Sequence, residues 1–215
     1  MDLTIYRSAI FDCDGVILDS NGMKSRAFRQ ALEGEEPELI DQFSRYHQQN
    51  GGVSRTIKFR HFYQVMKEEK DFEKKAEATM RRYSELAKQG LLRCPEIPGI
   101  RKLLDHLYVQ GASLFVVSGG DEEEVLSVFE ARNLLRYFKK ILGSPKTKNE
   151  NMALLEKERL LRRPAVYFGD SAADLEAAEA FGLDFVFVAS RSEWRDGRDK
   201  IAAKRLPAIE DFSNL

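Results

Sequence analysis

Residues able to do chemistry gather at four places in the 215-residue sequence, and each place follows a predicted strand. The first is Asp12-Cys13-Asp14-Gly15-Val16, directly after the apolar segment Ser8-Ala9-Ile10-Phe11. Two carboxylates two residues apart can divide the roles of nucleophile and of general acid and base. Acidic residues are also common in turns, so this motif alone does not establish a function.

The second and third places supply groups that bind anions. Ser118-Gly119-Gly120 follows the apolar run 113–117 and precedes a predicted helix, where a hydroxyl and backbone N–H groups can hold a phosphate. The same residues could simply cap that helix. Lys148, with Lys146 as its rival, follows the next apolar segment. Its ammonium could neutralise a phosphate and an attacking carboxylate together.

The fourth place, Gly169-Asp170-Ser171-Ala172-Ala173-Asp174, follows the strand-like run 165–168. Asp170 lies at the end of that run, and Asp174 lies one helical turn later. Carboxylate oxygens suit Mg²⁺, which also keeps waters and substrate phosphate as ligands. Both acids could instead stabilise the start of a helix. In a parallel sheet, however, ligands bind beyond the carboxyl ends of the strands, where all four motifs fall.

The elements that must position these motifs alternate between strand and helix, which predicts a parallel sheet. Strands are expected at 8–11, 113–117, 137–142, 165–168 and 185–188, with helices between the last four and a further helix at 100–110. Between about residues 35 and 89, aromatic and charged residues alternate at helical spacing instead. The prediction is therefore an α/β fold: a Rossmann-like core with helices on both faces (1–19 and 90–215) and an inserted all-helical cap (20–89).

Composition excludes several other classes of protein. The net charge of -1 gives no basic field that would attract nucleic acid. The apolar runs are too short to span a bilayer, and the N-terminus lacks a signal-peptide pattern. Two cysteines, Cys13 and Cys94, make no disulfide framework. We expect a cytoplasmic protein that binds neither nucleic acid nor a membrane, as a monomer or else a dimer.

Together the four motifs resemble those of the haloacid dehalogenase superfamily, in its β-phosphoglucomutase- and phosphoglycolate phosphatase-like subgroup with a helical cap. The resemblance covers nearly all of the chain outside the cap and the tail. It implies that Asp12 is the nucleophile and a ligand of Mg²⁺. Asp14 would ligate the metal through its backbone carbonyl and serve as acid and base. Crowding by other carboxylates would raise the pKa of Asp14, which the metal would oppose.

The resemblance also assigns the remaining motif residues. Ser118 and the N–H of Gly119 would bind the phosphate, and Lys148 would brace it. Asp170 would ligate the metal, and Asp174 would ligate it or support the other ligands. The sequence thus predicts a Mg²⁺-dependent phosphatase that hydrolyses a small phosphorylated metabolite, with a sugar phosphate favoured, through an aspartyl-phosphate.

Substrate contacts are expected from the cap. The segment Gly52-Val53-Ser54-Arg55 resembles a substrate-contacting loop of β-phosphoglucomutase-like proteins, so Arg55 would hold a second anionic group or a sugar. Lys58 and His61 follow at helical spacing and could add to this contact, or could form an ordinary solvated face. A closing cap admits small substrates and excludes water.

Two positions depart from the mutase pattern. Lys24 stands where the mutases carry a histidine, and Gly51 stands where they carry a lysine. Those residues help a mutase to choose a sugar rather than water as phosphate acceptor, so their absence favours hydrolysis, although Lys24 could still contact substrate. A phosphosugar mutase is the alternative. A non-catalytic binding protein is a further one, against which the intact acidic set argues.

Overall fold

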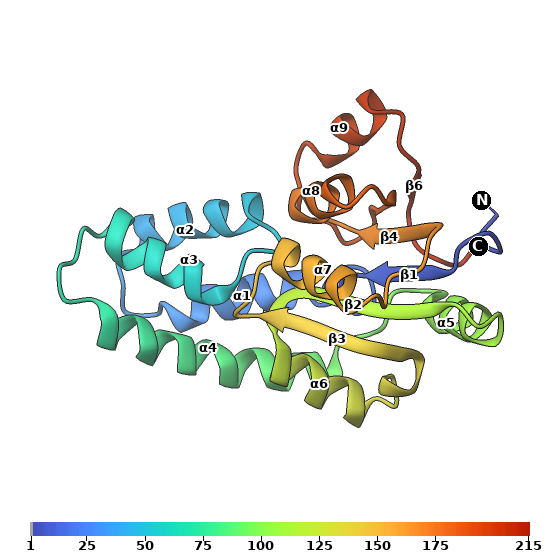
Figure 1. The fold of residues 1–215 in the computed structure, drawn as a ribbon. Helices are drawn as coiled ribbons and strands as arrows, with labels where there is room; N and C mark the ends of the chain where they lie inside the picture. The colour runs from blue at the N-terminus through green and yellow to red at the C-terminus, as the bar shows by residue number, and fades with distance from the viewer. Residues whose placement is uncertain (1) are drawn as a thin grey trace.

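The computed structural model describes residues 2–215 and contains a six-stranded parallel sheet in the order β3-β2-β1-β4-β5-β6 (Figure 1). β1 lies in the middle of the sheet, paired with β2 and β4. The carboxyl ends of these three strands therefore meet at one edge. The strands are β1 (Ser8–Phe11), β2 (Ser113–Asp121), β3 (Phe138–Ser144), β4 (Ala165–Gly169), β5 (Asp184–Val188) and β6 (Ala208–Ile209).

Helices cover both faces of the sheet. One face packs against α5 (Ile100–Val109) and α6 (Glu122–Ala131), and a short 3₁₀ turn, η2 (Leu135–Tyr137), leads into β3. The other face packs against α7 (Lys148–Lys157), α8 (Ala172–Ala180) and α9 (Gly197–Ala203). Successive β1 side chains, such as Ile10 and Phe11, enter opposite cores. Burial on both faces explains why β1 is a continuous apolar run.

A helical insertion between β1 and α5 forms the cap, which extends beyond the carboxyl ends of the strands (Figure 1). It has a hydrophobic core of its own, in which fully buried Phe43 stacks on Phe59, with ring centroids 5.6 Å apart, and meets Phe62 edge-on. Its elements are α1 (Asn21–Ala31), α2 (Pro37–Gln49), α3 (Arg55–His61), the π-helical turn η1 (Phe62–Met66) and α4 (Glu73–Arg93).

The structure confirms the predicted α/β class with its helical insertion and corrects some limits of elements. β2 continues through the Ser118-Gly119-Gly120 motif, because a register shift brings Asp121 opposite Ser144 of β3. That motif therefore lies within the end of the strand and not after it. α4 continues past residue 89 to Arg93, and the domain limits 20–89 and 90–215 stay predictions. Among the helices described in residues 2–215, none is long and apolar enough to cross a membrane.

Truncation of the central cap aromatic should destabilise the protein. We expect Phe43→Ala to lower the free energy of unfolding by about 3–5 kcal/mol, because it leaves a cavity among packed rings. Urea unfolding followed by circular dichroism measures the change. Val65→Ala is the control, since Val65 is 56% exposed and its truncation should cost less than about 0.5 kcal/mol. Equal losses in the two variants would contradict an independent cap core.

Candidate active site

Three buried carboxylates meet where β1 and β4 end. Asp12 follows β1, Asp170 follows β4 and Asp174 lies in the first turn of α8; one oxygen of each lies within 4.8 Å of the others. The parallel pairing of β1 with β4 puts the first two side by side. Gly15 allows the backbone of the Asp12–Gly15 turn to lie close to Asp170, because its φ is +76° and a Cβ there would lie 2.3 Å from Oδ2 of Asp170.

The ammonium of Lys148, at the start of α7, reaches this acidic cluster. It lies 3.0 Å from Oδ1 of Asp12 and also pairs with Asp174. The other oxygen of Asp174 accepts hydrogen bonds from the N–H and the hydroxyl of Ser171, at 3.1 and 2.5 Å. Asp174 therefore orients the lysine. Lys146 is exposed, so of the two candidate lysines the structure brings Lys148 to the cluster.

The cluster holds more negative charge than Lys148 can neutralise. Burial raises the pKa of Asp12 to about 7, although Lys148 opposes this. Burial, and then the charge of Asp12, raises the pKa of Asp170 well above its ordinary range. Apart from its ion pair with Lys148, Oδ1 of Asp12 has no hydrogen-bond partner within residues 2–215. Such oxygens fit a hard divalent cation of the Mg²⁺ type.

The carboxylate of Asp14 turns toward α1. Its Oδ2 lies 2.7 Å from Nζ of Lys24, and its Oδ1 accepts a hydrogen bond of 2.5 Å from the hydroxyl of Ser20. Burial raises the pKa of Asp14, but Lys24 and Ser20 outweigh it, so the net pKa lies below its ordinary value. The expectation that carboxylate crowding raises this pKa is wrong here, because an ammonium is the nearest charge.

The cap loop rests directly on the predicted phosphate-binding motif. A Cβ on Gly119 would lie 2.0 Å from the carbonyl oxygen of Gly52, so only glycine fits beneath the loop. Gly51 is similarly close to the core, since a Cβ there would lie 3.1 Å from Cβ of Ser171. The hydroxyl of Ser118 is buried and accepts a hydrogen bond of 3.0 Å from the N–H of Gly120.

Arg55 joins the cap to the core. Its guanidinium pairs with Glu124 of α6 at 2.8 Å and with Asp121 at 3.2 Å, and it lies 5.7 Å from the centroid of the Tyr83 ring. Two carboxylates of the core therefore already neutralise the Arg55 guanidinium, which was expected to contact an anionic group of the substrate.

Lys58 and His61 differ in position although both lie on α3. Lys58 is buried and lines the pocket, where it donates a hydrogen bond of 2.9 Å to Nδ1 of His47. The ring of His61 stacks on Tyr46 at 4.0 Å and is not part of the pocket wall. Three residues of an α-helix fall about 60° short of a full turn. His61, six residues after Arg55, is therefore rotated by about 120° from the direction of Arg55 and faces away from the pocket.

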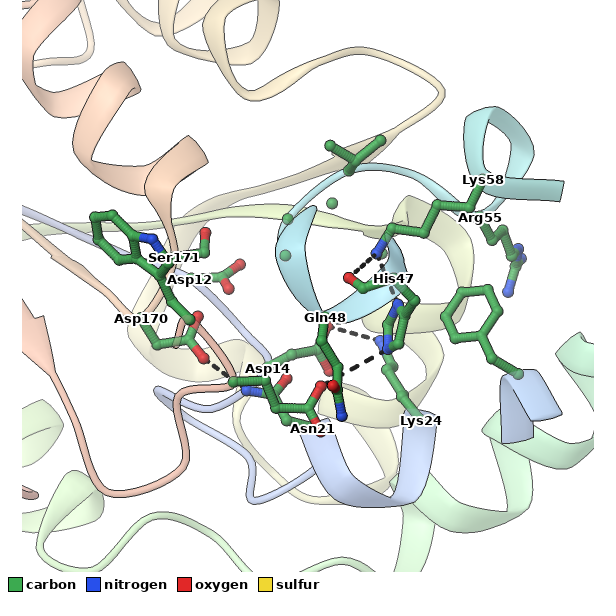
Figure 2. Close-up of a pocket in the computed structure, with 18 of the residues that line it drawn as sticks. Asp12, Asp14, Asn21, Lys24, His47, Gln48, Arg55, Lys58, Asp170 and Ser171 are labelled. Atoms are coloured by element: carbon green, nitrogen blue, oxygen red, sulfur yellow. Dashed lines mark hydrogen bonds and ion pairs between the residues drawn. The ribbon is translucent and has the colours of Figure 1, made fainter. Parts of the chain in front are cut away.

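One pocket, lined by Asp12, Asp14 and Asp170 of the core and by residues of the cap, lies between the two (Figure 2). Sequence reasoning missed several of its residues. Asn21 donates a hydrogen bond of 2.6 Å to Oδ2 of Asp170, and its place next to the first motif was a usable signal. His47 belongs to α2, and Glu193 and Trp194 come from the loop after β5, where nothing in the sequence marks them.

Two phosphatases of known name are similar to this chain in sequence. A "Phosphorylated carbohydrates phosphatase" of Thermotoga maritima is 23% identical over 214 residues, which cover 94% of each chain. A phosphoglycolate phosphatase of Rhodobacter capsulatus is 30% identical over 125 residues, 55% of this chain and 54% of that protein.

Solved structures share the fold. A predicted phosphoglycolate phosphatase from Haemophilus somnus superposes with a TM-score of 0.78 at 19% identity, over 99% of this chain and 97% of its own. A β-phosphoglucomutase from Clostridium difficile gives 0.70 at 16% identity, over 98% and 93%. The model of haloacid dehalogenase-like hydrolases matches residues 9–188, which hold all four motifs and the cap. This confirms the resemblance: the chain belongs to the haloacid dehalogenase-like hydrolases and is a phosphatase of that family.

Proposed function

We propose that the protein is a Mg²⁺-dependent phosphatase that hydrolyses a small phosphorylated metabolite, such as a sugar phosphate, through a phosphoryl group carried on Asp12. The observation that carries the proposal is the buried Asp12 carboxylate, which lines the pocket and whose Oδ1 has Lys148 as its one polar partner within residues 2–215. The names of the relatives, phosphatases of phosphorylated carbohydrates and of phosphoglycolate, support it. The monomeric state and the cytoplasmic location stay predictions.

Two successive displacements at phosphorus complete the reaction. An oxygen of Asp12 forms a bond to phosphorus while the bond from phosphorus to the substrate oxygen breaks, and protonated Asp14 gives that oxygen its proton. Ionised Asp14 then removes a proton from water, whose oxygen attacks the phosphoryl group and releases inorganic phosphate and free Asp12. Asp14 thereby regains from water the proton that it gives to the leaving oxygen in the next cycle. The ion pair with Lys24 favours the ionised form that the second step needs and opposes the protonated form that the first step needs.

Positive charge must accumulate around the phosphate for Asp12 to approach it. Lys148 supplies one such charge, and the N–H of Gly119, with Ser118, would hold the phosphate oxygens. Mg²⁺, held by Asp12, Asp170 and the Asp14 carbonyl, with Asp174 beside them, would supply the remainder.

Hydrolysis is favoured over phosphosugar transfer by two features of the pocket. Gly51 offers no side chain to hold a second sugar, and a Cβ at this position would lie only 3.1 Å from Cβ of Ser171. The ammonium of Lys24, which stands in place of the mutase histidine, lies 2.7 Å from Asp14 and is neutralised by it. If a sugar phosphate were isomerised in the presence of a bisphosphate activator, without net release of phosphate, the mutase reading would replace this one.

Loss of the nucleophile should abolish turnover. We expect Asp12→Asn to lower the rate of Mg²⁺-dependent phosphate release by about 10³-fold or more, because an amide cannot take the phosphoryl group. Release from a panel of sugar phosphates, short phosphorylated acids and p-nitrophenyl phosphate measures this. Asp199→Asn, at an exposed position of α9, is the control and should retain wild-type rates. A rate of phosphate release in Asp12→Asn close to that of the control would contradict a phosphoryl group carried on Asp12.

Metal binding should depend on pH in a definite direction. The raised pKa values of Asp12 and Asp170 mean that the metal-free protein loses stability as the pH rises from about 4 through 7. Mg²⁺ competes with these protons, so it should raise the melting temperature more at pH 8 than at pH 5.

Differential scanning fluorimetry with Mg²⁺ and with EDTA measures this effect without any substrate. Asp170→Asn should lose most of the Mg²⁺-dependent rise in melting temperature, while Asp199→Asn should keep it. A rise of the same size in Asp170→Asn, or one that is larger at pH 5, would argue against a metal in the acidic cluster.

A further inference from the structure

The cations that line the pocket differ in whether a carboxylate neutralises them. Lys24 pairs with Asp14, and Arg55 pairs with Glu124 and Asp121. Lys58 is different: within the described chain no carboxylate lies within 4 Å of its ammonium, yet the residue is only 3% exposed. A buried ammonium without a counter-charge is costly and readily gives up its proton, so an anionic ligand in the pocket would stabilise its charged form.

Hydrogen bonds hold the Lys58 ammonium in place without neutralising it. It donates to Nδ1 of His47 at 2.9 Å and lies 3.5 Å from the His47 carbonyl oxygen. Since an ammonium has three N–H groups, one remains free. The other ring nitrogen of His47 lies 3.0 Å from the hydroxyl of Ser25, which in turn bonds to Glu193. These hydrogen bonds from His47 through Ser25 to Glu193 orient the imidazole ring so that Nδ1 accepts a hydrogen bond from Lys58.

The protonation of these groups agrees with this arrangement. Burial, and then the charge of Lys58, lowers the pKa of His47 well below its ordinary value, so the ring is neutral. Burial and the charge of Lys24 lower the pKa of Lys58 to about 7, with a smaller contribution from Lys148, while Glu193 and Asp14 oppose this. A bound anion would favour the charged lysine.

Lys58 also stands apart from the phosphate site. Figure 2 shows Lys58 and His47 on the cap side of the pocket, across from Asp12 and Asp170. A group that contacts Lys58 is therefore another part of the substrate than the phosphate that Asp12 attacks. We propose that Lys58 is the subsite for a second anionic group, a carboxylate or a second phosphate, on the phosphate monoester that this pocket binds. The inference rests on the proposed phosphatase activity and gives Lys58 the role that the sequence gave to Arg55.

Paired substrates test the subsite. Phosphoglycolate is compared with ethylene glycol monophosphate, and glucose 1,6-bisphosphate with glucose 6-phosphate, so that each pair differs in one anionic group. We expect the wild type to favour the more anionic member of at least one pair by about tenfold or more in kcat/KM. The pair that shows the preference identifies the anion as carboxylate or phosphate.

Variants of Lys58 then assign the preference. Lys58→Met should lower the preference about tenfold, mainly through KM for the anionic member, and Lys58→Arg should restore part of it. Each variant is described by the ratio of kcat/KM for the two substrates of a pair, so a general loss of activity cancels. Melting curves show whether each variant folds. Lys75→Met removes an exposed cap lysine and should leave the ratio unchanged. No preference in the wild type, or an equal preference in Lys58→Met, would overturn the proposal.

Binding separates this proposal from the proposed activity. Calorimetry with the Asp12→Asn variant compares phosphoglycolate with ethylene glycol monophosphate, and glucose 1,6-bisphosphate with glucose 6-phosphate, without turnover. Tighter binding of the anionic member, lost on adding Lys58→Met, supports the subsite even if no substrate is hydrolysed. Equal binding within both pairs contradicts the subsite alone, whereas absent hydrolysis of every substrate contradicts the phosphatase.

Discussion

The close burial of carboxylates at the end of β1 and β4 is the constraint on which the rest of the structure depends. Two like charges about 5 Å apart repel by roughly 3 kcal/mol at an effective dielectric constant of about 20, and the cluster contains three such groups. Lys148, Asn21 and the start of α8 offset part of this repulsion. The remaining negative charge fits the cluster to hold a divalent cation, which in the proposed mechanism would attract the phosphate, and the central strands hold the carboxylates in place.

The cap determines which positively charged side chains of the pocket remain without a carboxylate partner. Its loop rests on the predicted phosphate-binding motif at Gly119, and Arg55 pairs with Glu124 of α6, so the pocket lies between cap and core with Lys24 and Arg55 already paired with acids. Burial of its lining lowers the local dielectric and strengthens the remaining interactions. Under these conditions a single unmatched ammonium, that of Lys58, has a large influence on which substrates bind.

The sequence was most informative where local chemistry and position coincide. Apolar runs followed by Asp12 and Asp170 predicted both the strands and the acidic edge, because parallel pairing leaves few other arrangements. Pairings across the fold were out of reach: nothing near Arg55 indicates that it meets Glu124, and nothing in the charged tail indicates that Glu193 lies beside Ser25. The lowered pKa of Asp14 has the same origin, since it depends on the direction in which the α1 lysine points.

If Asp12 carries the phosphoryl group during turnover, that group can be trapped on it. The enzyme is mixed with Mg²⁺ and its best substrate, quenched in acid within milliseconds, digested and analysed by mass spectrometry. We expect one phosphoryl group on the peptide that contains Asp12, assigned to that residue and removed by hydroxylamine, as an acyl phosphate should be. A phosphoryl group on another residue, or rapid turnover with no labelled peptide at any quench time, would contradict it.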